Sequence, residues 1–212
     1  MVTSPLPTQD GRVLRGERNR EAVVESMLAL IEEGDPQPTA KRVAERAGVA
    51  LRSVFHHFDD VESLLAAAAR LQAQRHWHVI QPIAADLPLA ERVAQVAAQR
   101  SALFERIAAA RRAALLAEHD SPVIGAWLEE SRAMLRRQLA LTFAPELARD
   151  GRDLLAALEV SASWTAWESL RRRQGLSVNA SRRVLTRLLT VLVEAAIVEA
   201  AVVEPAQLKE PS

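Results

Sequence analysis

The sequence contains no cysteine and no tyrosine, and its aromatic residues are limited to four tryptophans and four phenylalanines. The absence of cysteine excludes disulfide bonds and thiolate sites for zinc or iron–sulfur clusters, and it favours a reducing compartment. No apolar run reaches the roughly 18 residues of a membrane span, and the N-terminal residues lack the apolar segment of a secretory signal. The sequence therefore predicts a cytoplasmic protein without a membrane partner.

An excess of charge is missing as well, because 27 Lys and Arg residues balance 27 Asp and Glu residues. A chain without net positive charge binds nucleic acid only through a local basic patch. Hydrophobic residues make up 49% of the 212 residues. This content excludes a disordered chain and is sufficient for the cores of one or two domains.

Helix-forming residues dominate what is present. Ala, Leu and Val supply most of the apolar content, and the strict alternation of half-buried strands is absent. The long stretches 89–117 and 181–203 contain neither Gly nor Pro, and Gly and Pro elsewhere divide the chain into about nine predicted helices. We expect an all-α protein with an N-terminal arm and three-helix domain over residues 1–65 and a larger helical domain over residues 66–212.

Residues 39–65 carry the most specific pattern in the chain. Thr39 is placed to cap a helix over residues 40–47, and Gly48 follows where the chain needs a left-handed conformation. A second helix is predicted to begin near Leu51, and its expected buried residues are Val54, Phe55 and Phe58. Two short helices around a tight glycine turn have the spacing of a helix-turn-helix.

The local charge of this segment favours DNA binding. Between residues 41 and 52 the single acid Glu45 is outnumbered by four cations, which are Lys41, Arg42, Arg46 and Arg52. The N-terminal arm adds further arginines over residues 12–20. We interpret this patch as a DNA-binding surface, and an ordinary solvated charged face is the alternative.

The stretch over residues 20–65 resembles the DNA-binding domain of the TetR family of transcriptional regulators. The shared features are the helix led by Thr39, the Ala-Gly-Val turn at 47–49, a short recognition helix and the His57-Phe58 pair. The resemblance implies an all-helical homodimer whose N-terminal domains bind a palindromic operator on double-stranded DNA. It also implies a larger domain that dimerises and binds a small-molecule effector, which in most relatives controls a repressor.

Outward-facing positions of the recognition helix are the candidate DNA contacts. Arg52 carries the donors that recognise guanine O6 and N7, and Lys41 matches a position that reaches the groove in some relatives. The predicted DNA-binding residues are Thr39, Lys41, Arg42, Arg52, Ser53, His56 and His57. A role in packing or in contacting phosphate is the alternative for His57. Adjacent histidines point about 100° apart on a helix, so the pair predicts no metal site.

Three residues depart from the family pattern. Ala50 stands in place of a common Ser or Thr, Phe55 in place of Tyr, and Val61 in place of Lys. Each change removes a donor worth about 1–2 kcal/mol where it contacts phosphate. The alternative function is therefore a dimeric helical small-molecule-binding protein with weakened or lost DNA recognition. A DNA-binding protein without ligand control is a further alternative.

The last long helix has more apolar surface than one core face needs. Its polar positions form one narrow stripe, which consists of Arg183, Arg187, Thr190 and Glu194. We expect one apolar face to lie in the core of the protomer and a second to pair with another copy, together with a preceding helix over about residues 152–173. The predicted interface residues are Leu155, Leu185, Leu188 and Leu192. A fully buried helix in a monomer is the alternative.

Large side chains on separate predicted helices are the candidates for an effector pocket. The rings are Trp77, Phe104, Trp127 and Trp164, and the polar groups are His119 and Glu130. Packing in the core is the alternative for each ring. No nucleophile elbow, HExxH motif or glycine-rich phosphate loop occurs. We therefore predict no enzyme, no catalytic residue, no cofactor and no metal.

Overall fold

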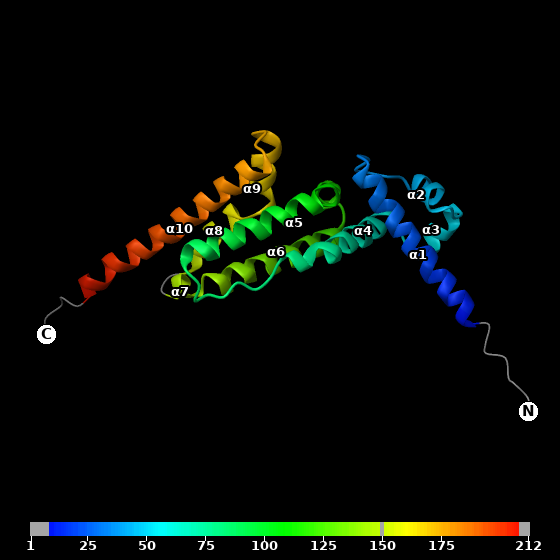
Figure 1. The fold of residues 1–212 in the computed structure, drawn as a ribbon. Coiled ribbons are helices and arrows are strands. Elements are labelled where there is room, and N and C mark those ends of the chain that lie inside the picture. The colour runs from blue at the N-terminus through cyan, green and yellow to red at the C-terminus, as the bar shows by residue number, and fades with distance from the viewer. Residues whose placement is uncertain (1–8, 149–150, 208–212) are drawn as a thin grey trace, which may run out of the picture. The chain divides into compact units, whose positions relative to one another are not determined.

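The computed structural model describes residues 9–148 and 151–207, which form helices and turns without a strand (Figure 1). The predicted all-α fold is confirmed. The α-helices are α1 (Gln9–Glu32), α2 (Ala40–Ala47), α3 (Leu51–His57), α4 (Val61–His76), α5 (Leu89–Ala117), α6 (Pro122–Thr142), α7 (Ala144–Leu147), α8 (Gly151–Ser161), α9 (Trp164–Glu168) and α10 (Val178–Gln207). Within these residues, no helix combines the length and apolar character that a bilayer span requires.

The described residues separate into two compact units. The first unit contains the chain up to His76 together with residues 107–129. The second contains residues 77–106 and the chain from Glu130 onward. Each of the long helices α5 and α6 therefore has one end in the first unit and the other end in the second. The functional division of the chain into residues 1–65 and 66–212 remains a prediction.

Residues 9–20, expected as part of an arm, form the first half of α1 instead. Four of these twelve residues are Arg, which is a strong helix former, but the stretch also contains Gly11 and Gly16 and lacks the apolar periodicity on which the prediction of helices depends. Residues 1–8 lie outside the described residues. The second half of α1 buries Val23, Met27 and Ile31, and α1 packs against α2, α3 and α4.

One expected core residue of the helix-turn-helix lies on the surface. Val54 and Phe58 are buried as predicted, but Phe55 is 50% exposed, and the prediction that it is buried was wrong. The reason is geometric. Residues four apart share one side of a helix, whereas Phe55 lies about 100° around the axis from Val54.

In the second unit, side-chain hydrogen bonds join α5 to α6. Gln138 on α6 donates through Nε2 to Gln99 Oε1 on α5 at 2.6 Å. The α5 residues Val93, Val96 and Leu103 are buried. α10 packs against α7, α8 and a π-helical turn at 169–173 that continues α9.

The single helix expected over about residues 152–173 is interrupted, and that prediction was wrong. α8 ends at Ser161, and α9 begins after Ser163, whose Oγ accepts a hydrogen bond from the Ala166 N–H at 3.1 Å. Serine is a preferred N-cap because its oxygen satisfies an N–H at the start of a helix. Gly175 has a φ of +64° and ends the helical segment as predicted.

Candidate nucleic-acid interface

Local hydrogen bonds fix the turn between α2 and α3. Thr39 caps α2, because its Oγ1 accepts a hydrogen bond from the Arg42 N–H at 3.3 Å. Gly48 has φ +66° and ψ +30°, and the following Val49 N–H donates to the Ala44 carbonyl at 3.1 Å. A residue with a side chain is strained at this φ. The predicted structural roles of Thr39 and Gly48 are confirmed.

The outer side of α3 carries an apolar row beside a polar row. Leu51 and Phe55, four residues apart, are 43% and 50% exposed. Arg52 and His56 form the adjacent row and are also exposed. Within the described residues, Arg52 has no ion-pair partner. The surface of α3 thus presents one available guanidinium, one imidazole and two apolar side chains.

A pocket of about 490 Å³ lies between α1 and α3. Its lining consists of Arg15, Gly16, Asn19, Arg52, Ser53, His56 and His57. Four of the predicted DNA-binding residues are therefore brought together, and α1 adds polar groups beside them. Arg15 and Asn19 were not among the predicted contacts, because this stretch was expected to be an arm. Its density of arginines was the available signal.

His57 is half-buried next to His56, with the ring centroids 5.3 Å apart. Burial lowers the pKa of His57, and the charges of His56 and Arg20 lower it further. His57 is therefore mostly neutral at pH 7, so its ring offers one donor and one acceptor. Arg52 supplies the permanent positive charge of this surface.

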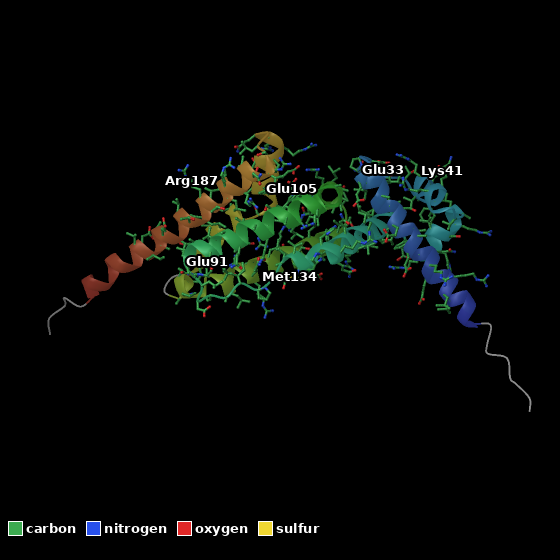
Figure 2. All side chains as sticks on the ribbon, in the orientation of Figure 1. Glu33, Lys41, Glu91, Glu105, Met134 and Arg187 are labelled. Atoms are coloured by element: carbon green, nitrogen blue, oxygen red, sulfur yellow. The ribbon has the colours of Figure 1, made fainter. Side chains whose placement is uncertain are left out.

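Two arginines of α2 are already paired with carboxylates. Arg46 donates to both carboxylate oxygens of Glu33 at 2.6 and 2.7 Å, and Arg42 pairs with Asp35. The hydrogen bond to Arg46 holds the pKa of Glu33 below its usual value. Lys41 is 77% exposed, and Figure 2 labels it on α2 together with Glu33 at the end of α1. Much of the basic patch seen in the sequence is thus neutralised locally.

The predicted interface leucines differ in exposure. Leu185 is buried in the core, Leu155 and Leu192 are half-buried, and Leu188 is 42% exposed. Further exposed apolar residues of α10 are Val191, Ile197 and Val198. α10 therefore has one apolar face that is buried and additional apolar side chains that are exposed.

The candidate pocket residues are divided between the two units. The first unit contains His119 and Trp127, and the second contains Trp77, Phe104, Glu130 and Trp164. His119 and Glu130 are exposed, Trp77 is half-buried and the other three are buried. Phe104 and Trp164 pack edge to face with centroids 5.7 Å apart, which favours the core interpretation for these two rings. Among the described residues, no group of three or more His, Asp or Glu side chains is arranged to hold a metal ion.

The fold is similar to those of two solved transcriptional regulators. One, from Rhodococcus sp. Rha1, has 18% identity and a TM-score of 0.64, and the match covers 85% of this chain and 96% of that chain. The other, from Pseudomonas aeruginosa PAO1, has 19% identity and a TM-score of 0.57, with 85% and 92% covered. No protein-family model and no curated protein matches the sequence. At this level of identity the likeness establishes the fold alone.

Proposed function

We propose that the protein is a homodimeric, ligand-responsive transcriptional repressor of the TetR type that binds a palindromic operator through α3. The single observation that carries the proposal is the arrangement of α3, which follows the left-handed turn at Gly48 and exposes Arg52 and His56. Its occurrence in a fold shared with two transcriptional regulators supports the same conclusion.

The exposed apolar surface of α10 around Leu188 supports the homodimer. A twofold dimer carries two copies of α3, which suit half-sites about 34–36 Å apart on DNA. In this proposal residues 1–65 bind DNA, and residues 66–212 dimerise and bind the effector. The effector acts by favouring a conformation that cannot bind the operator, and its difference in affinity between the two conformations sets the extent of release.

The test is selection of binding sites from a random DNA pool, followed by titration of the selected site with wild type and Arg52→Ala. Loss of a bidentate guanine contact costs about 1–3 kcal/mol, or roughly 5- to 150-fold in affinity, and relaxes the sequence preference at that base. The matched control is Arg173→Ala, which removes an exposed arginine from the second unit. It is expected to leave affinity unchanged.

A palindromic consensus bound by a dimer, with loss in Arg52→Ala alone, supports the proposal. Equal loss in both variants would mean that binding follows total charge, and it would contradict a recognition role for α3. Selection that returns no consensus would contradict operator binding altogether.

A small-molecule-binding protein with weakened DNA recognition is the second candidate. The pairing of Arg42 with Asp35 and of Arg46 with Glu33 favours it, because both arginines are engaged before DNA arrives. The missing cap on α3 points the same way, since Ala50 makes no side-chain hydrogen bond there. An effector bound in the absence of any selected DNA site would establish this function instead.

A further inference from the structure

Arg100 is a charged residue in the middle of a buried apolar stripe of α5. The stripe includes Val93, Val96, Ala97, Leu103, Phe104 and Ile107, and Arg100 occupies the position between them that helical periodicity assigns to the core. The side chain is 0% exposed, which makes it the largest fully buried side chain of the described residues. A stripe of this kind normally contains only apolar side chains, because burial of a charge is costly.

The guanidinium of Arg100 is only partly satisfied. Its Nη2 donates to the Leu135 carbonyl on α6 at 2.7 Å. Its Nε and Nη1 have no hydrogen-bond partner, and no carboxylate of the described residues pairs with it. Burial lowers the pKa of Arg100 to about 9, so the group is still charged at pH 7.

A second buried arginine of α5 does have a counter-ion. Arg92 is also buried, and it makes two hydrogen bonds to the carboxylate of Glu146 at 2.8 and 2.6 Å. Its Nε donates to the Leu87 carbonyl, and its Nη1 also donates to the Thr142 carbonyl. Arg100 is buried on the same helix, but it has no carboxylate partner and donates only to the Leu135 carbonyl.

The residues adjoining Arg100 along α5 and α6 combine polar and aromatic character. Gln99 precedes it, and Gln138, one turn beyond Leu135, bonds to Gln99 while its own buried Oε1 has no partner. Phe104, one turn beyond Arg100, packs against Trp164. A ligand group bound at Arg100 would therefore meet hydrogen-bonding groups beside the buried apolar side chains of the α5 stripe.

We propose that Arg100 binds the carboxylate of an effector that also carries an apolar body. The Nε and Nη1 groups of Arg100 donate hydrogen bonds to the carboxylate, and the buried apolar side chains that flank Arg100 on α5 contact the apolar part. This inference rests on the ligand-responsive function proposed above and names the chemical class of the effector. An ordered water bound to Arg100 is the competing explanation for its open donors.

Thermal unfolding of the purified full-length protein tests the proposal with a panel of monocarboxylates, namely benzoate, phenylacetate, octanoate and decanoate. Benzyl alcohol, octanol and decanol serve as neutral counterparts. We expect at least one carboxylate to raise Tm by roughly 5 °C or more near saturation. We expect its neutral counterpart to produce less than half of that shift.

Arg100→Met is the decisive variant, because it keeps an unbranched apolar side chain and removes the charge. We expect the carboxylate shift to disappear and the Tm of the ligand-free variant to rise by a few degrees, since an uncompensated buried charge is gone. Arg106→Met, which removes an exposed arginine of the same helix, is the matched control and is expected to keep the full shift.

Three results would overturn the inference. These are equal shifts with carboxylates and alcohols, an undiminished shift in Arg100→Met, and a lower Tm of ligand-free Arg100→Met, which would indicate a water-supported structural role. DNA binding is measured separately by the selection described above. Operator binding without a carboxylate response would refute this inference and leave the DNA-binding part of the proposed function intact.

Discussion

In the core of the second unit, Arg92 and Arg100 are both buried on α5, yet only Arg92 meets a carboxylate. On the surface of the helix-turn-helix, Arg46 is exposed and nevertheless meets Glu33 through two hydrogen bonds. In this protein, the burial of an arginine therefore does not determine whether it pairs with a carboxylate. The difference teaches that an unpaired arginine in the core is a stronger indication of a ligand than a basic patch is, because its energetic cost is uncompensated.

The largest effect is expected from removing the counter-ion of Arg92. Glu146→Gln leaves a buried charge without a carboxylate, and we expect a loss of about 3 kcal/mol or more in the free energy of unfolding. Urea denaturation measures it. The control is Glu159→Gln, which breaks the more exposed pair with Arg136 and is expected to cost about 1 kcal/mol or less. Equal losses of unfolding free energy in both variants would contradict the expectation that the buried ion pair contributes more to stability than the exposed one.

An intermediate effect is expected from pH acting on Arg100. Its native pKa of about 9 lies well below that of an arginine in the unfolded chain, so the unfolded chain binds more protons than the native protein above about pH 9. The free energy of unfolding therefore rises with pH as Arg100 deprotonates, by about 1.4 kcal/mol per pH unit above pH 9. Between pH 8 and pH 10.5, we expect the free energy of unfolding of wild type to increase by about 2 kcal/mol relative to that of Arg100→Met.

The alkaline range is favourable for this measurement, because the sequence has no cysteine or tyrosine and its only lysines are Lys41 and Lys209. Denaturation of both proteins across the range gives the difference directly. A stability difference that stays constant with pH would show that Arg100 is not the isolated buried charge described above.

The smallest effect is expected at the exposed pair. Glu33→Gln releases Arg46, and if α2 faces the DNA backbone, the slope of log affinity against log salt steepens by about 0.9 for one added phosphate contact. Titrations of the selected operator across a salt series measure the slope, and Glu159→Gln is the distant control. An unchanged slope in Glu33→Gln would place Arg46 away from the phosphates.

Much of the helix-turn-helix could be predicted from the sequence, because its determinants act over a few residues. Thr39 caps the helix that it precedes, and Gly48 takes the left-handed turn next to it. The assignment of Phe55 to the core failed, because apolar character does not say which side of a seven-residue helix faces the protein. The break at Ser163 was overlooked, although the capping preference of serine was available as a signal.

The candidate site in the second unit was predicted less well. The search for large rings found Phe104 and Trp164, which pack against each other. Arg100 was missed, although its position in the apolar stripe of α5 was visible in the sequence. The lack of a carboxylate partner for Arg100 was not visible in the sequence, because periodicity shows that a side chain is buried without showing which groups surround it.

The helical class of the chain, the turn between α2 and α3, and the two apolar faces of α10 follow from propensity, capping and periodicity, which depend on residues close together in the chain. By contrast, the pairing of Glu146 with Arg92, 54 residues away, and of Glu33 with Arg46 depends on how the helices pack. The same holds for the open donors of Arg100. Partners of this kind are set by how helices pack, because a charged side chain interacts with whichever group the fold brings within hydrogen-bond distance.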